Sequence, residues 1–454
     1  MYFQRKKEFE ALTNLLNSGG HAILLYGKRR VGKTTLIKEV VKNKKYQYFE
    51  CLADSLDNNL ISFTNELKNN GMRVPSFVNF NSFVDAFEYL DSLNELITVV
   101  IDEYPYLKSL NNSLTVDSLF QKIIDNHLHN INLVVLGSQM KIMEELLYEG
   151  NPLSGRFNLS ILLEEMNYKE VSAFYSDKSI YDKVAFYSVF GGSPYINRSI
   201  DPTLDLRSNI INTFLKTGSE VYNYANNIAI TDVANKLQAQ RILSFIGNGK
   251  KRYSDISFIL DIDKTGIINK PLNSLLDLKI ISKRCPINKL NDNKKIRYEI
   301  EDNVLRFFYT YVYNRGSTLF ALGEETFYDQ YIAPTINEYI SLRYERIVKD
   351  YFSLLCKENK LSGIRNIGTY YYDDPVNKKN GEFDIALETN NGYEIYEAKY
   401  LKDKMKKSQM HLEAEQIKNI REIKVTKIGF VSISGFEDND PNYNLIDGND
   451  LYNL

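Results

Sequence analysis

Three short runs of apolar residues in the first third of the chain predict buried strands. They are His21–Tyr26, Leu96–Ile101 and Leu133–Gly137. Each run is short and bounded by glycine or polar residues, a pattern typical of a strand that is covered on both faces of a parallel sheet. Apolar residues at helical spacing follow the first run over Thr35–Val41. Strand, loop and helix in this order predict an α/β domain.

A glycine-containing loop follows the first of these strands directly. Its residues are Gly27, Lys28, Arg29, Arg30, Val31, Gly32, Lys33, Thr34 and Thr35. The two glycines let backbone N–H groups close around phosphate, Lys33 brings positive charge to the terminal phosphates, and Thr34 can bind Mg²⁺. The start of the helix also attracts anions. The spacing therefore predicts a P-loop that binds ATP together with Mg²⁺.

Acidic and polar residues end the other two apolar runs. Asp102 and Glu103 follow the second run as in a Walker B motif, so Asp102 is expected to hold Mg²⁺ through water and Glu103 to polarise the attacking water. Ser138 and Gln139 follow the third run. Ligands of parallel sheets bind at the carboxyl ends of strands, so these two side chains are candidates for sensing the γ-phosphate.

These motifs resemble, in their order along the chain, those of archaeal-type ATPases of the AAA+/STAND P-loop class. The likeness covers residues 1–200 and includes Phe3–Glu8, the phosphate loop, Asp102–Pro105, Ser138, Pro152–Arg156 and Gly191–Pro194. It implies that Arg156 approaches the phosphates and that Gly192–Pro194 contact the base side of the nucleotide from a helical lid. For Arg156, an ordinary surface arginine after a turn is the alternative.

The middle of the chain is locally basic. Residues 235–315 hold sixteen Lys and Arg against eight Asp and Glu, whereas the whole chain has a net charge of −2. Three segments are predicted to be helices: Asn235–Gly247, Tyr253–Leu260 and Lys264–Lys279. Two strand-like runs follow them, Ile280–Ile287 and Lys295–Ile300. Three helices and a hairpin predict a winged helix, which the family resemblance also implies.

A winged helix of this charge suggests contact with double-stranded DNA. The side chains expected to face a groove are Lys264, Asn269, Lys270 and Asn273, and those expected to contact phosphate from the wing are Lys283, Arg284, Lys294, Lys295 and Arg297. Pro271 lies inside the third helix, where it requires a kink or a late helix start. Winged helices also serve as packing modules, so a purely structural role stays open.

Two strand-like runs near the C-terminus, Glu382–Leu387 and Tyr393–Lys399, flank the turn signal Asn391-Gly392. A two-residue turn pairs Asp384 with Lys399, and a looser turn pairs it with Glu397. Glu397 and Lys399 share a face of their strand, so either register groups two carboxylates with one lysine. An ordinary salt-bridged hairpin has the same pattern and is the alternative.

This grouping resembles the PD-(D/E)xK nuclease superfamily, here in a DUF234-type domain. The resemblance implies that Asp384 and Glu397 bind Mg²⁺ while Lys399 orients or deprotonates the water that attacks a phosphodiester. Glu345, on a helix expected over Ile336–Leu355, and Gln416, on the helix after the hairpin, are further candidates. Asp374 is an alternative first acid of the motif.

The chain as a whole is thus expected to be a multidomain α/β protein. Its predicted parts are a P-loop ATPase core over 1–160, a helical lid over 161–230, a winged helix over 231–315 and a restriction-endonuclease-like α/β domain over 316–454. The hydrophobic fraction of 43% is that of a folded protein, and the absence of a signal sequence or long apolar run predicts a cytoplasmic location without membrane contact.

The leading hypothesis is an ATPase that couples a nucleotide switch to DNA binding and metal-dependent DNA cleavage. The alternative is an ATP-switched regulatory or signalling protein whose C-terminal domain is a catalytically inactive docking platform. ATP and Mg²⁺ are the expected cofactors in both cases. Double-stranded DNA is the expected partner in the first, and assembly into a homo-oligomer is open in either.

Overall fold

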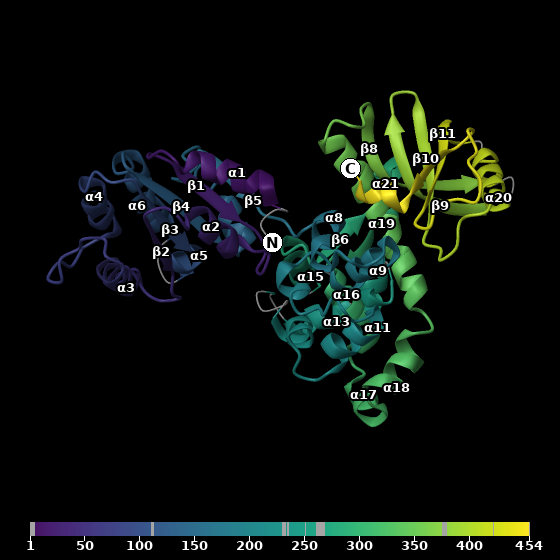
Figure 1. Ribbon diagram of the computed structural model, residues 1–454, viewed down its shortest axis with the longest axis horizontal. Helices are drawn as coiled ribbons and strands as arrows, with labels where there is room; N and C mark the ends of the chain where they lie inside the picture. The colour runs from purple at the N-terminus through teal and green to yellow at the C-terminus, as the bar shows by residue number, and fades with distance from the viewer. Residues whose placement is uncertain are drawn as a thin grey trace. The chain divides into compact units, whose positions relative to one another are not determined.

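The computed structural model describes residues 5–109, 113–228, 233, 236–249, 251–259, 268–374, 379–420 and 422–453. The chain divides into two compact units (Figure 1). The first unit runs to Glu165 and also includes Ser193–Tyr195, and the second comprises Met166–Gly192 and Ile196–Leu454. The multidomain α/β class predicted from the sequence is confirmed.

A five-stranded parallel sheet forms the centre of the first unit. Its strands are β1 (Ala22–Tyr26), β2 (Tyr46–Glu50), β3 (Ile97–Asp102), β4 (Ile131–Gly137) and β5 (Leu159–Leu162), in the order β2-β3-β4-β1-β5. The three apolar runs seen in the sequence are the three central strands, which are buried at every position. Burial on both faces explains why their apolar residues are consecutive rather than alternating.

Helices cover both faces of this sheet. They are α1 (Lys6–Leu15), α2 (Lys33–Val41), α3 (Leu56–Asn69), α4 (Phe83–Ser92), α5 (Pro105–Ser109), α6 (Ser113–Asn126) and α7 (Met140–Glu145). Leu24 of β1 belongs to one buried cluster with Phe63 of α3 and Phe87 of α4, whereas its neighbour Ile23 belongs to another with Leu12 of α1. The alternation of β1 between the two clusters fixes the layered order of helix, sheet and helix.

The second unit begins with short helices. They are α8 (Tyr168–Val171), η2 (Ser172–Tyr175), α9 (Ile180–Phe190), α10 (Pro194–Asn197, with its first two residues in the first unit), α11 (Leu206–Ile210), η3 (Ile211–Leu215), α12 (Glu220–Asn223) and η4 (Tyr224–Ile228). An aromatic chain of Phe190, Phe214, Phe307 and Tyr339 joins them to later helices. Because this apolar contact is continuous, the segment predicted as a lid packs with the C-terminal part of the chain.

A three-helix and hairpin module follows. It consists of α13 (Lys236–Gly247), α14 (Tyr253–Ile259), α15 (Asn269–Asp277), β6 (Ile281–Arg284), η5 (Ile287–Lys289), η6 (Asn293–Lys295) and β7 (Arg297–Ile300). The strands β6 and β7 pair antiparallel, with Ile281 opposite Ile300. Since α15 begins at Asn269, Pro271 lies in the first helical turn, where no backbone donor is needed. A late helix start therefore accommodates the proline.

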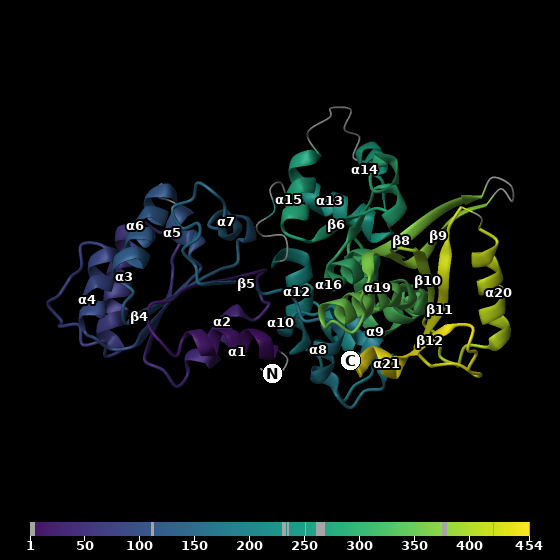
Figure 2. The ribbon, with the colours of Figure 1, turned by 90° about the horizontal axis from the view of Figure 1, so that it is seen from above.

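The last part of the chain is a mixed sheet between two helices. After α16 (Asn303–Phe307), η7 (Phe308–Val312), α17 (Gly316–Leu322), α18 (Glu324–Phe327) and η8 (Tyr328–Ile332) come α19 (Ile336–Lys357), β8 (Ile364–Asp374), β9 (Lys379–Thr389), β10 (Gly392–Lys399), α20 (Lys407–Lys418), β11 (Val425–Ser432), β12 (Asn444–Asp447) and α21 (Gly448–Tyr452). The sheet order is β12-β11-β10-β9-β8. Figure 2 shows α19 and α20 on opposite faces of this sheet.

Candidate functional site

The phosphate loop connects β1 to α2. It leaves the strand at Gly27 and enters the helix at Gly32, whose φ of 96° lies in the left-handed region that favours glycine. A Cβ added to Gly27 would lie 2.2 Å from the carbonyl oxygen of Leu163. Both glycines are therefore required by the local backbone, and the loop opens into the N-terminus of a helix as the sequence predicts.

Lys33 folds back over this loop. Its side-chain nitrogen donates hydrogen bonds of 2.9 Å to the carbonyl oxygens of Gly27 and Lys28. The residue is 6% exposed, and this burial lowers the pKa of the ammonium, although Glu103 and Asp102 oppose the shift. A buried cation whose hydrogen bonds go to neutral carbonyl groups is prepared to accept an anion such as phosphate.

Thr34 and Asp102 meet beside the loop. The Thr34 hydroxyl donates a 2.8 Å hydrogen bond to the Asp102 carboxylate, which also accepts one from the Tyr48 hydroxyl. Ligands at adjacent positions of an octahedral Mg²⁺ lie about 3.0 Å apart, given bond lengths of about 2.1 Å. The two oxygen atoms thus fit neighbouring positions around such an ion.

Glu103 has an unusual backbone conformation at the end of β3. Its φ of 52° is in the left-handed region, which a residue with a side chain adopts at a cost of about 1–3 kcal/mol. Its carboxylate accepts hydrogen bonds from the Ser138 hydroxyl at 2.9 Å and from the Ser138 backbone nitrogen at 3.3 Å. The end of β4 therefore fixes the orientation of this carboxylate.

Residues 193–195 pack against the phosphate loop within the first unit. The Ser193 hydroxyl donates a hydrogen bond to the Arg30 carbonyl at 3.3 Å, and the Arg30 guanidinium lies 3.9 Å from the centre of the Tyr195 ring. Pro194 comes within 3.8 Å of the position that a Cβ on Gly32 would occupy. This segment is therefore brought to the loop although more than 150 residues separate the two in the sequence.

Arg156 lies near the amino ends of the strands, at the opposite end of the sheet from the phosphate loop. It precedes β5, whose first residue Leu159 stands beside Ile23 near the amino end of β1, whereas the phosphate loop follows the carboxyl end. Its side chain forms hydrogen bonds of 2.8 and 3.0 Å with Asp125 at the end of α6. Because parallel strands run in one direction, the structure does not bring Arg156 to the phosphate site of this chain.

Side chains of three elements meet on the C-terminal sheet. Pairing of β9 and β10 runs from Gly392 opposite Thr389 to Tyr396 opposite Ile385, where the regular pairing ends. Of the two registers left open by the sequence, this is the one that leads toward Asp384 and Glu397, and the charge of Asp384 acts on the Glu397 carboxyl. The turn residues are Asn390 and Asn391, one position earlier than the Asn-Gly signal suggests.

Lys399 bridges two carboxylates in this cluster. Its side-chain nitrogen lies 3.4 Å from Glu397 and 3.0 Å from Glu413 of α20. Burial, reinforced by the charges of Asp384 and Glu413, raises the pKa of Glu397 to about 7 even though Lys399 opposes the shift. Burial alone would lower the pKa of Lys399, but the two carboxylates outweigh it and raise that pKa. The lysine is thus held as a cation.

The other candidates near this sheet are not part of the cluster. Glu397 lies on the face covered by α20, because Ile395 packs there and Lys399 pairs with Glu413 of that helix, whereas Glu345 belongs to α19 on the opposite face (Figure 2). Gln416 is exposed one turn after Glu413 on α20. The side chain of Asp374 lies outside the described residues.

The predicted DNA-contacting residues fall into two groups. Asn269, Lys270 and Asn273 are exposed on α15, while Lys264 lies outside the described residues. The wing instead packs on β8, where Asn288 exchanges hydrogen bonds of 2.7 and 3.0 Å with the Tyr371 backbone. The Lys295 nitrogen lies 3.3 Å from the centre of the Tyr371 ring.

Two wing arginines are also engaged within the protein. Arg284 is paired with Glu299 and Glu301, and Arg297 donates hydrogen bonds to the carbonyls of Lys294 and Ile296. These contacts hold both guanidinium groups against the protein. Lys283 and Lys294 of the wing are exposed, as are Asn269, Lys270 and Asn273 of α15, so both elements retain predicted contact residues at the surface.

Several residues of the two clusters could not be recognised from the sequence. Tyr48 and Tyr195 reach the phosphate loop from β2 and from the segment after α9, and Glu413 reaches Lys399 from α20. None of them belongs to a motif with fixed spacing. The sequence signal for Glu413 is its position on the helix after the hairpin, where the candidate predicted from the sequence is Gln416.

The described residues include neither a cluster of metal ligands nor a membrane-spanning helix. No three carboxylate, imidazole or thiolate side chains there are close enough to enclose a metal ion by themselves. Among the described helices, none has the length and apolar character that crossing a membrane requires.

Comparison with protein families identifies two parts of the chain. Residues 2–196 match the model of an ATPase domain found predominantly in Archaea, and residues 308–417 match DUF234, a family of archaeal and bacterial proteins of unknown function. The chain therefore combines a P-loop ATPase domain of archaeal type, which binds ATP, with a C-terminal DUF234 domain.

Similar proteins come from Methanocaldococcus jannaschii. An uncharacterised protein of this organism is 28% identical over 80% of this chain and 79% of its own length. An uncharacterised ATP-binding protein is 27% identical over 42% of this chain and 68% of its own length.

Two solved structures are among those to which the chain is similar. The Walker-type ATPase of Pyrococcus abyssi superposes with a TM-score of 0.48 at 17% identity, covering 67% of this chain and 95% of that one. The ORC2 protein of Aeropyrum pernix gives 0.46 at 12% identity, covering 70% and 95%.

Proposed function

We propose that the chain couples an ATP-driven switch in its N-terminal domain to a metal-dependent nuclease site on its C-terminal sheet. The observation that carries the nuclease half is the group of Asp384, Glu397, Lys399 and Glu413 at one end of β9, β10 and α20. Burial, with a smaller contribution from the charges of Asp384 and Glu413, raises the pKa of Glu397 to about 7, and strongly shifted titrating groups are concentrated at functional sites.

In the nucleotide half, each residue of the loop has a separate task. Lys33 binds the terminal phosphates, Thr34 and Asp102 hold Mg²⁺, and Glu103 orients the attacking water. Ser138 keeps the Glu103 carboxylate in place, and Pro194 borders the loop at Gly32. Mg²⁺, when bound, neutralises charge on the phosphate oxygens.

In the nuclease half, Asp384 and Glu397 are the residues that would hold Mg²⁺. Two protein carboxylates suit this ion, since it usually keeps several waters and takes other oxygens from a substrate phosphate. The ion, when bound, lowers the pKa of a coordinated water. Lys399 is kept protonated by Glu397 and Glu413, so it orients that water or stabilises negative charge on the phosphate rather than taking up a proton.

DNA contact is proposed through α15. Its exposed Lys270 and Asn273 point away from the packed side of the helix, which buries Pro271, Leu272 and Leu275. If α15 binds duplex phosphates, affinity falls as salt rises, with a log–log slope near −0.9 for each phosphate neutralised. Lys270→Gln should flatten this slope, and an unchanged slope would remove α15 from the interface.

The nuclease proposal is tested by incubating the full chain with linear duplex DNA, Mg²⁺ or Mn²⁺, and ATP. Asp384→Asn should lose metal binding and cleavage together, whereas Lys399→Ala should keep the metal and lose most cleavage. Lys427→Ala is a matched control, because Lys427 of the neighbouring strand β11 pairs with Glu394 of β10 at 3.8 Å outside this cluster. A wild-type chain that binds no metal at the C-terminal domain and cuts no DNA would refute the nuclease assignment.

One observation favours the docking-platform alternative. Lys399 is already paired with two carboxylates, and such a network is also typical of a structural ion-pair cluster. Under this alternative Lys399→Ala lowers the thermal stability of the chain, and DNA remains intact in wild type and variant alike.

A further inference from the structure

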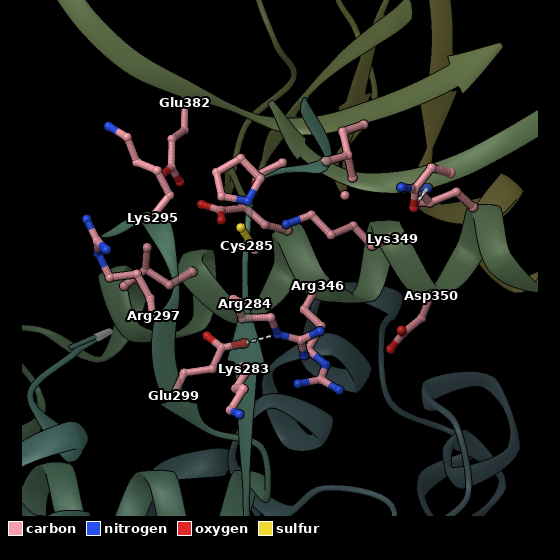
Figure 3. Close-up of a pocket in the computed structure, with 18 of the residues that line it drawn as sticks. Lys283, Arg284, Cys285, Lys295, Arg297, Glu299, Arg346, Lys349, Asp350 and Glu382 are labelled. Carbon is pink, nitrogen blue, oxygen red and sulfur yellow. Dashed lines mark hydrogen bonds and ion pairs between the residues drawn. The ribbon is translucent and has the colours of Figure 1, made fainter. Parts of the chain in front are cut away.

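A cavity of about 540 Å³ lies between the wing, helix α19 and the edge of the C-terminal sheet (Figure 3). The side chains that line it include five arginines and three lysines but only four carboxylic residues. Its volume is that of a site for a small ligand or part of a larger one. The cavity lies entirely within the second unit and apart from the Glu397–Lys399 cluster.

At the base of the cavity, more guanidinium groups than carboxylates take part in ion pairs. Glu299 pairs with Arg284 at 2.5 Å and with Arg306 at 3.8 Å. Glu301 pairs with Arg284 at 2.8 Å and also with Arg346. Two carboxylates thus form ion pairs with three arginines. In Figure 3, Arg346 of α19 extends toward Arg284 of β6.

Buried donors remain unused around this network. The Nη1 of Arg346 and the Nε of Arg343 are buried and have no hydrogen-bond partner among the described residues. Arg343 is only 3% exposed, so water cannot easily satisfy it. Buried donors without acceptors are costly, and an acceptor entering the cavity would remove this cost.

Burial leaves the positive charge poorly balanced. It raises the pKa of Asp350, which weakens this carboxyl as a counter-charge even though Arg346 opposes the shift. Burial also lowers the pKa of Arg306, to which the neighbouring charge of Arg343 adds. Burial is the largest cause of both shifts, and for Arg306 the like charge of Arg343 acts in the same direction.

We propose that this cavity binds an anion carrying at least two phosphate groups. Arginine forks match the geometry of phosphate oxygens, and the excess of cationic side chains calls for a multiply charged ligand. The same chemistry is available from a free diphosphate or from the phosphates of a nucleic-acid strand. The proposal is independent of the nuclease assignment, since it uses none of the residues of that cluster.

The test uses the full chain with Lys33→Ala, so that the phosphate loop does not capture the probes. Inorganic pyrophosphate is titrated by calorimetry. A short oligothymidylate labelled with fluorescein at its 3′ end is titrated by anisotropy, with and without a 5′ phosphate. If only pyrophosphate binds, the ligand of the cavity is a free diphosphate. If only the 5′-phosphorylated strand binds, the ligand is the end of a strand. If both strands bind, the ligand is the phosphate backbone of a nucleic acid.

Two added substitutions, Lys283→Gln and Lys349→Gln, remove charge from the cavity lining. They should lower the affinity for any probe that binds by at least tenfold, since one charge-assisted contact corresponds to about a tenfold change. Lys216→Gln with Lys357→Gln is the control, because it removes the same charge from exposed positions away from the cavity and should change affinity less than about twofold.

Arg346→Lys keeps the charge but removes the unpartnered Nη1, so it should also weaken binding, with melting curves recorded without ligand to show that the variant is folded. The proposal is overturned if none of the three probes binds. It is equally overturned if the lining variant and the control variant bind with the same affinity.

Discussion

Lys33 and Lys399 are both largely covered lysines beside carboxylates, yet their pKa values shift in opposite directions. Burial among backbone carbonyls lowers the pKa of Lys33, and Asp102 and Glu103 do not reverse this. Lys399 is in direct contact with Glu397 and Glu413, which outweigh burial and raise its pKa. Among the described residues Lys33 therefore has no carboxylate in an ion pair with it, and a phosphate can supply that charge, whereas Lys399 is paired with two carboxylates of the protein.

The largest effect should come from Lys33→Ala. Loss of two charge-assisted contacts of about 2 kcal/mol each should weaken ATP binding on the order of a thousandfold. Isothermal titration calorimetry with ATP and Mg²⁺ measures this change. Lys399→Ala and Lys42→Ala, the second at an exposed position just after α2, should leave the affinity unchanged. Equal affinities for wild type and Lys33→Ala would contradict the comparison.

Glu103→Gln should separate binding from hydrolysis. The substitution keeps the size of the side chain and its contact with Ser138 but removes the charge that orients water, so hydrolysis should slow about a hundredfold or more while ATP affinity stays within about threefold. Phosphate release at saturating ATP gives the rate, and calorimetry gives the affinity. Normal turnover in this variant would assign the catalytic role to another residue.

Glu397→Gln should change how stability depends on pH. The folded-state pKa of Glu397 is about 7 and the unfolded value is about 4.3, so wild-type stability decreases as pH rises through this window. The variant cannot lose a proton there. Its free energy of unfolding relative to wild type should therefore increase by up to about 3 kcal/mol between pH 4 and pH 8.

Urea unfolding at several pH values measures that difference. Glu394→Gln is the control, because Glu394 lies on the same strand and pairs with the exposed Lys427. A difference that stays constant with pH would show that folding does not shift the pKa of Glu397, and the comparison of the two lysines would then lose its basis in the C-terminal domain.

The smallest effect is expected for Ser138→Ala. Loss of one hydrogen bond to the Glu103 carboxylate should slow hydrolysis about tenfold with little change in KM, since Ser138 positions Glu103 and does not hold the nucleotide. In a Glu103→Gln background the same substitution should have almost no further effect. Additive losses in the double variant would indicate that Ser138 acts on the nucleotide directly.

Local patterns predicted the central strands of the first sheet and the elements of the winged helix. β1, β3 and β4 are apolar runs because both faces are buried, so the sequence marks them clearly. The flanking β2 and β5 are only partly buried and were missed. Pro271 signalled an irregular helix, but only the structure shows that α15 begins two residues before it.

Residues separated in sequence were harder to place. The family likeness suggested phosphate contact for Arg156, but the direction of β5 puts this residue at the amino edge of the sheet beside Asp125. The turn signal at Asn391-Gly392 allowed two registers, and one residue of slip decides which side chain stands opposite Asp384. Such choices depend on packing between elements and not on the motif itself.

The phosphate loop could be predicted from sequence alone, because two glycines, a lysine and a threonine at this spacing between a strand and a helix are typical of one backbone conformation. The sequence also determined that Glu397 and Lys399 share a face, since side chains alternate along a strand. Only the tertiary structure decided that Glu413 neutralises Lys399 and that the wing and α19 enclose a cavity rich in arginine. Those contacts join elements far apart in the chain, and they follow from which apolar faces pack together.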